Sequence, residues 1–265
     1  MFLNDIDFSQ LYIEHRQSSG RGRTPVEKWD ARADKIQLGE IENTYTLRFM
    51  EQVQLTAQDT VLDVGCGSGA LTVLLAKQAQ QVYALDYSEG MLEKVKQNAA
   101  LHSVQNIKTV HKDWYEEWAD VPVCDVVVAS RSTLVDDMQA ALQRLNAHAR
   151  KRVYVSYPAN PFFVDAEVAV ILGRKKQAFP DYFYIPAILH TLGFYPNLRF
   201  IEYPSKLANT ANFEEFVRRL NVDEPLSAEQ HEALRNWYEA DPERAKLGGE
   251  PTRWALIDWA PQRKI

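Results

Sequence analysis

The chain has 265 residues, which is enough for one large α/β domain with insertions and a full hydrophobic core. With 46% hydrophobic residues and ordinary glycine and proline counts, the composition excludes a fibrous, disordered or membrane-embedded chain. The net charge of -6 argues against nonspecific binding of nucleic acid through a basic face, and two cysteines are too few for a disulfide scaffold.

The first fifty-odd residues predict helices rather than a targeting segment. Asp5 and Asp7 stand where a secretory signal requires a basic start, so we expect a cytoplasmic protein with no membrane attachment. Residues 25–36 and 41–55 have helical periodicity, and the second segment places Tyr45, Phe49 and Val53 one above another. We expect residues 1–56 to form a helical cap on the sheet that follows.

Between residues 61 and 155, short β-branched runs alternate with longer amphipathic runs. This alternation is typical of a parallel sheet with crossover helices. Strands are predicted at 61–64, 82–85, 107–110, 125–129 and 152–156, and helices at about 69–79, 89–100 and 135–147. Ser88 is a good N-cap for the second of these helices, and Ser132 or Thr133 is expected to cap the third.

The C-terminal part adds two insertions and two strands. Residues 158–180 interrupt the pattern before a helix that is predicted to end at Gly193 and a sixth strand at 198–204. Residues 206–250 form a second insertion with helical periodicity at 213–220 and 227–238, and 253–260 is the last strand. We therefore expect an α/β fold with helices on both faces of a seven-stranded, mostly parallel sheet that ends in an antiparallel hairpin.

The stretch "TVLDVGCGSGALTVLLAK" is a glycine loop between the first strand and the first helix. Gly65, Gly67 and Gly69 fit a dinucleotide-binding turn and equally a loop that holds S-adenosylmethionine (SAM). Asp63 favours SAM, because its carboxylate would repel a pyrophosphate but attract the sulfonium and ammonium groups. Cys66 is expected to fill space in the loop rather than to act as a nucleophile.

Polar and aromatic residues follow the next strands. Asp86 ends the second strand, where a carboxylate can accept hydrogen bonds from both ribose hydroxyls. Asp113 follows the third strand and can accept the adenine amino group, with Tyr87 or Trp114 covering the ring faces. Asp113 could instead cap a short helix, and Trp114 could belong to the core. Ser130 ends the fourth strand beneath the expected position of the methyl group.

The segments "LDVGCGSG", "ALDYS", "KD" and "DVVVAS" occur in the order and spacing of the class I SAM-dependent methyltransferase family, which the sequence resembles from about residue 60 to 156 and more weakly to 260. The resemblance implies a Rossmann-like sheet, SAM as cofactor and a methyltransferase domain at 57–265. Trp114 departs from the small residue that the family often has there. The candidate cofactor-binding residues are Asp63, Gly65, Cys66, Gly67, Gly69, Asp86, Tyr87, Asp113, Trp114 and Ser130.

The sequence identifies the methyl acceptor less clearly than the cofactor, because methyl transfer from a sulfonium mainly requires alignment and exclusion of water. Residues 129–132 read Ala-Ser-Arg-Ser, which disfavours the Asn/Asp-Pro-Pro-Tyr chemistry on adenine N6 or glutamine. No Pro-Cys pair follows the fourth strand, which excludes a cytosine-C5 mechanism, and the six scattered histidines predict no metal site.

We expect a small, anionic acceptor in a closed pocket, formed where helices 25–36 and 41–55 and the insertions 158–180 and 206–250 meet over the carboxyl ends of the strands. An RNA acceptor, or a SAM- or dinucleotide-binding protein without transfer activity, stays as an alternative. No catalytic residue is assigned. The candidate acceptor contacts are Arg131, Tyr157, Tyr182, Tyr184, Trp29 and Arg32.

Overall fold

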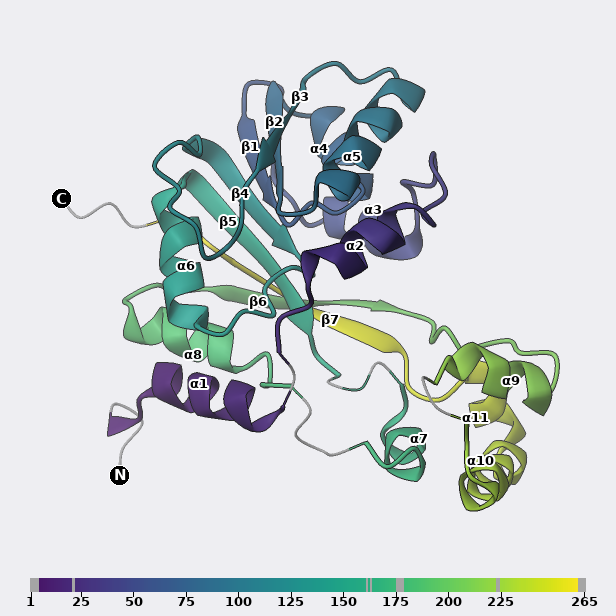
Figure 1. The fold of residues 1–265 in the computed structure, drawn as a ribbon. Helices are drawn as coiled ribbons and strands as arrows, with labels where there is room; N and C mark the ends of the chain where they lie inside the picture. The colour runs from purple at the N-terminus through teal and green to yellow at the C-terminus, as the bar shows by residue number, and fades with distance from the viewer. Residues whose placement is uncertain are drawn as a thin grey trace.

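A seven-stranded sheet forms the centre of the computed structural model, which describes residues 5–20, 22–160, 162, 164–174, 179–222 and 225–261 (Figure 1). The strand order is β3-β2-β1-β4-β5-β7-β6, and β7 runs antiparallel to both of its neighbours. The sheet confirms the expected mostly parallel, Rossmann-like class with a terminal antiparallel hairpin. Its strands are β1 (Thr60–Val64), β2 (Gln81–Asp86), β3 (Ile107–His111), β4 (Cys124–Ser130), β5 (Ala149–Pro158), β6 (Asn197–Tyr203) and β7 (Thr252–Trp259).

Helices cover both faces of the sheet. One face carries α3 (Thr44–Met50), α4 (Ala70–Ala76) and α5 (Glu89–Leu101), and the other carries α1 (Phe8–Ser18), α6 (Met138–Ala147) and α8 (Tyr184–Thr191). Successive β4 side chains alternate between the two layers, so Val126 and Val128 join one apolar cluster while Val127 and Ala129 join the other. The sheet is therefore buried on both sides, as a parallel sheet requires.

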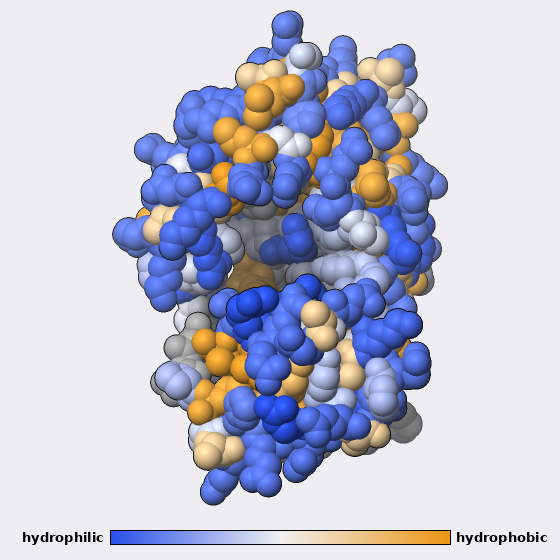
Figure 2. All heavy atoms as spheres, turned by 90° about the vertical axis from the view of Figure 1, so that its right-hand side faces the viewer, coloured by the Kyte–Doolittle hydropathy of each residue, from blue (hydrophilic) through white to orange (hydrophobic). Residues whose placement is uncertain are grey.

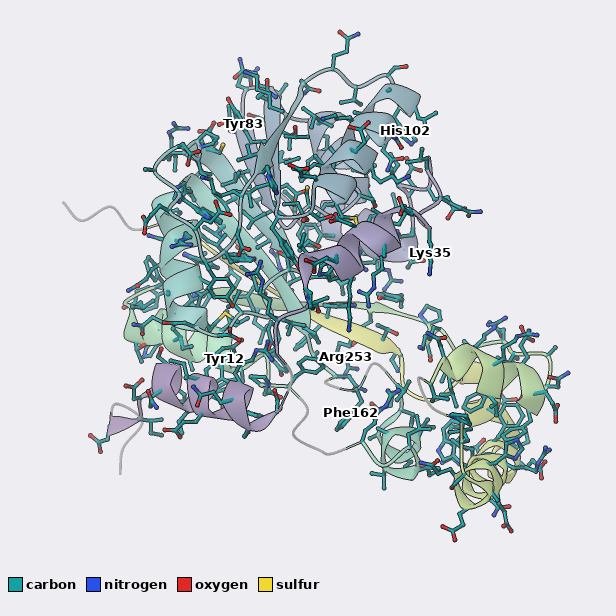
Figure 3. All side chains as sticks on the ribbon, in the orientation of Figure 1. Tyr12, Lys35, Tyr83, His102, Phe162 and Arg253 are labelled. Carbon is teal, nitrogen blue, oxygen red and sulfur yellow. The ribbon has the colours of Figure 1, made fainter. Side chains whose placement is uncertain are left out.

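The N-terminal helices pack on different neighbours. The α1 helix lies against α6 and α8, α2 (Val26–Ala33) lies on α5, and α3 contacts α4 and β6. Helix α1 was missed by the sequence analysis, although Asp7 caps it by accepting a hydrogen bond from the Gln10 amide. Its Tyr12 projects toward α8 and donates to the Val135 carbonyl oxygen at 2.7 Å (Figure 3).

Two helices begin three residues later than predicted. The segment predicted at 41–55 is helical from Thr44 to Met50, and it begins there because Asn43 forms a capping box with Thr46. Helix α6 begins at Met138, since the Asp137 side chain accepts the Ala140 amide. The predicted caps, Ser132 and Thr133, are therefore wrong.

The insertions gather into a separate lobe beside the sheet, made of α7 (Ala166–Ile171), α9 (Phe213–Leu220), α10 (Ala228–Ala240) and α11 (Pro242–Leu247) (Figure 1). The helices bury their apolar faces on one another around Phe216, Leu234 and Trp237. Among the described residues, no helix is both long and apolar enough to cross a bilayer.

Candidate active site

The glycine loop is tied to the end of β2 by its own main chain. The amides of Gly65 and Cys66 both donate to the Leu85 carbonyl oxygen, at 2.7 and 3.0 Å. Gly65 and Gly67 have φ of +67° and +54°, which side-chain-bearing residues avoid. A Cβ at Gly65 would lie 2.3 Å from the Ser132 Cβ, whereas one at Gly67 would meet nothing within 4 Å. Gly65 is thus required for packing, and Gly67 leaves open space above the loop.

That space belongs to a cavity of about 550 Å³ at the carboxyl ends of β1, β2 and β4. The face seen in Figure 2 is hollowed at mid-height, with hydrophilic residues around the hollow. Nine of the ten candidate cofactor residues line the cavity, from four different segments of the chain. They are Asp63, Gly65, Cys66, Gly67, Asp86, Tyr87, Asp113, Trp114 and Ser130.

Asp63 is a buried carboxyl group at the end of β1, with 1% of its surface exposed. It accepts a hydrogen bond of 2.6 Å from the Thr72 hydroxyl. Burial raises the pKa of Asp63 to about 7, with the Thr72 hydrogen bond opposing the rise and the nearby Asp86 charge adding to it. No described cationic side chain forms an ion pair with Asp63. A cationic ligand would therefore supply the missing counter-charge.

Asp86 shapes the loop as well as facing the cavity. Its carboxylate accepts the Gly67 amide at 2.9 Å and the Ser88 amide at 3.0 Å. Burial raises the pKa of Asp86, which the two amide hydrogen bonds partly offset. The sequence predicted that Asp86 contacts a ribose, but no local sequence pattern predicted its hydrogen bond with the Gly67 amide.

Cys66 and Gly69 contribute to the packing of the loop. Burial, with the Asp86 charge next in size, raises the pKa of the Cys66 thiol well above its usual range, so the thiol stays protonated at neutral pH. Gly69 is the N-cap of α4 with φ of +84°, and a Cβ there would lie 3.0 Å from Val95 Cγ2. Gly69 is absent from the cavity lining and allows α4 and α5 to approach each other.

Residues near the N-terminus contact Asp113 and Tyr87, the two residues expected to hold the adenine ring. Arg23 forms an ion pair with Asp113, and its guanidinium lies 4.8 Å from the centre of the Tyr87 ring and 5.3 Å from that of Tyr115. The Tyr87 hydroxyl donates to the Thr24 carbonyl oxygen at 3.0 Å. Sequence reasoning missed Arg23, because its polar surroundings carry no motif.

Asp113 and Trp114 each have contacts that fit both of the roles left open by the sequence, in the local structure and in the cavity wall. Asp113 accepts the Tyr115 amide at 3.1 Å, as in a local turn, and also lines the cavity. Trp114 donates from its indole nitrogen to the Ser132 carbonyl oxygen at 3.1 Å, and its ring lies 5.5 Å from that of the buried Trp118. Trp114 therefore joins the core to the cavity wall.

On the opposite side of the cavity, Arg131 follows β4 with φ of +57°. Its guanidinium lies 4.3 Å from the centre of the Tyr45 ring and 5.8 Å from that of Trp254. Tyr45 was predicted only as an apolar-face residue of a helix, but it is buried and also lines the cavity. The helical spacing could identify its burial, whereas its contact with Arg131 depends on the tertiary fold.

Of the other candidate acceptor contacts, one lines the cavity and four do not. Trp29 lines the cavity, and Arg32, which stacks on Trp29 at 4.6 Å, does not. Tyr157, Tyr182 and Tyr184 lie in the apolar layer between the sheet and helices α1 and α8, outside the cavity lining.

The expected cover over the cavity is only partly present. Among the described residues, Phe179 is the one lining residue from 158–180, and none comes from 206–250. The prediction that the second insertion closes the pocket is therefore wrong for these residues. Its helices satisfy their apolar faces within the lobe, which removes the driving force for packing on the cavity.

Comparisons with known proteins agree with this geometry. Residues 61–152 match the family model described as a methyltransferase domain. An uncharacterized protein of Haemophilus influenzae is 34% identical over 271 residues, covering 99% of this chain and 100% of its own length. The ribosomal protein L11 methyltransferase of Thermoanaerobacter pseudethanolicus is 36% identical over 85 residues, which cover 31% of this chain and 27% of that protein.

The fold is similar to that of a solved SAM-dependent methyltransferase from Thiobacillus denitrificans in complex with S-adenosyl-L-homocysteine (SAH). The TM-score is 0.53 at 17% identity, with 91% of this chain and 100% of that chain covered. The buried, unpaired carboxyl groups and the open space at Gly67 fit a cationic cofactor with a ribose. The chain belongs to the class I SAM-dependent methyltransferases and is an enzyme with SAM as its cofactor.

Proposed function

We propose that the enzyme transfers the methyl group to a small-molecule acceptor held in the 550 Å³ cavity. The observation that carries the proposal is the pairing of charges around the cavity. Four cationic side chains line it among the described residues, and three of them already have a carboxylate partner. The pairs are Arg16 with Asp136 at 3.4 Å, Arg23 with Asp113, and Lys112 with Asp120 at 3.0 Å.

A nucleic-acid acceptor requires a row of cations that can neutralise phosphates. Paired cations serve this purpose poorly, and Asp63 and Asp86 add negative charge to the same cavity. Arg131 alone, among the described cationic residues that line the cavity, forms no ion pair. A cavity of this volume is instead in the range that holds small ligands.

We further propose the cofactor contacts. Asp63 attracts the cationic part of SAM, Asp86 accepts hydrogen bonds from the ribose, and Gly67 lets the main chain approach the ligand closely. When bound, SAM supplies a methyl group on a positively charged sulfur that is ready for displacement. The residues of the chain then align the acceptor and exclude water, for which Trp29 and Phe179 provide apolar walls.

The test is methyl transfer from tritium-labelled SAM into a cell extract divided into low-mass, RNA and protein pools. After chromatographic removal of unreacted SAM, we expect label in low-mass compounds above the level of the extract without added enzyme, and no rise above that level with the Gly67→Val variant as a control. Label that enters only RNA or only protein would show that the small-molecule proposal is wrong.

A further inference from the structure

Three hydroxyl groups form a chain from the interior of the sheet to the cavity. Ser156 in β5 is the register partner of Ser130 in β4. The Tyr45 hydroxyl oxygen, which comes from α3, lies 2.6 Å from the Ser156 hydroxyl and 2.7 Å from the Ser130 hydroxyl. Ser156 is fully buried, whereas Tyr45 and Ser130 line the cavity. The row of three hydroxyl groups therefore ends at Ser130.

One order of the hydroxyl protons leaves a donor for the cavity. The Arg131 amide donates to the Ser156 hydroxyl oxygen at 3.0 Å. In each of the two Tyr45 contacts either oxygen can donate. The order in which Ser156 donates to Tyr45 and Tyr45 donates to Ser130 uses the buried protons within the row and leaves the proton of Ser130 for a ligand in the cavity.

Arg131 brings further donors to the same part of the cavity. Its left-handed backbone is unfavourable for a residue other than glycine, and such strain is concentrated at functional sites. In this conformation its amide reaches Ser156 while its guanidinium lies over the Tyr45 ring. The guanidinium has no carboxylate partner among the described residues, so its in-plane donors are available.

We propose that Ser130 and Arg131 bind a carboxylate group of the methyl acceptor, with Tyr45 as the positioning residue that directs the Ser130 proton. The inference rests on the proposed function, because it requires a small acceptor in this cavity. A guanidinium matches the planar, singly charged carboxylate in geometry and charge. A doubly charged phosphate would face the carboxylates of Asp63 and Asp86, and among the described lining residues Arg131 is the one cation without an ion pair to offset them.

Binding of matched probes tests the inference. Benzoate, indole-3-acetate and hexanoate are each titrated calorimetrically against their primary amides, with the protein saturated with SAH. We expect at least one acid to bind tenfold or more tightly than its amide, and Arg131→Gln to remove that preference. The control is Arg235→Gln, which removes a guanidinium that also lies over an aromatic ring, 4.2 Å from the centre of Phe213, but in the lobe and outside the cavity lining.

The positioning role of Tyr45 has its own readout. Tyr45→Phe keeps the ring under Arg131 and removes only the hydroxyl, so it should weaken the acid at least threefold and leave the amide unchanged. Adding Tyr45→Phe to Ser130→Ala should cause no further loss, because both act on the same hydrogen bond. An additive loss, or an equal loss for acid and amide, would show that Tyr45 has a structural role only.

The carboxylate of the cofactor offers the same chemistry, so SAH affinity is measured for every variant. We expect Arg131→Gln to change the SAH dissociation constant less than threefold. A loss of SAH affinity as large as the loss of acid affinity would assign Arg131 to the cofactor and overturn the inference. Equal binding of acid and amide in every pair, or no binding of any acid, would also overturn it. Either failure leaves the small-molecule proposal to the label-transfer assay, which does not depend on acceptor charge.

Discussion

Alanine substitutions at Gly65 and Gly67 separate packing from ligand contact within one loop. Both positions have positive φ, so each alanine costs about 1–2 kcal/mol for a left-handed backbone. At Gly65 the new Cβ would also lie 2.3 Å from the Ser132 Cβ, and overpacking adds about 1–3 kcal/mol. Ser132 is held by its hydroxyl, which donates to the Val64 carbonyl oxygen at 2.6 Å.

The free energy of unfolding should therefore fall by about 2–5 kcal/mol for Gly65→Ala and by about 1–2 kcal/mol for Gly67→Ala. The order should reverse for the ligand. The methyl group of Gly67→Ala enters open cavity space, and we expect SAM to bind at least tenfold more weakly, which corresponds to about 1.4 kcal/mol.

Urea denaturation followed by tryptophan fluorescence measures the first quantity, and titration calorimetry with SAM measures the second. Comparing the two variants controls for the backbone cost that they share. Wild-type stability in Gly65→Ala, or wild-type SAM affinity in Gly67→Ala, would refute the assignment of the two glycines.

Three further predictions concern other parts of the chain. Asp86→Ala should weaken SAM by about 1.5–3 kcal/mol in calorimetry, and full affinity would contradict its ribose contact. Since burial raises the pKa of Asp63 to about 7 and SAM selects the ionised form, the SAM dissociation constant should fall about eightfold from pH 5.5 to 6.5. For the same reason ligand-free protein should lose stability as pH rises from about 4 to 7, and Asp63→Asn should abolish both trends. Phe216→Ala should destabilise the lobe by about 3–5 kcal/mol in hydrogen exchange, yet leave SAM affinity unchanged because no described lobe helix lines the cavity.

Much of the fold was predictable because its signals are local. The alternation of β-branched and amphipathic runs predicted the first five strands, the segments 198–204 and 253–260 predicted the last two, and Ser88 caps α5 as expected. The start of α6 was not predictable in the same way. Ser132, Thr133 and Asp137 are all acceptable caps, but Asp137 caps the helix and the Ser132 hydroxyl donates to the Val64 carbonyl oxygen instead. That bond joins residues 68 positions apart, which no local pattern reports.

The sequence by itself determined that the residues proposed to contact the cofactor lie together. Asp63, Gly65, Gly67 and Asp86 fall within 24 residues, and one strand-loop-helix-strand unit places them together through main-chain geometry alone. The tertiary structure decided which residues gather on the proposed acceptor side of the cavity. Tyr45 meets Ser130 across 85 positions, and Arg23 meets Asp113 across 90. Such side chains carry no shared motif, because the packing of N-terminal segments on distant strand ends, and not their spacing in the chain, brings them together.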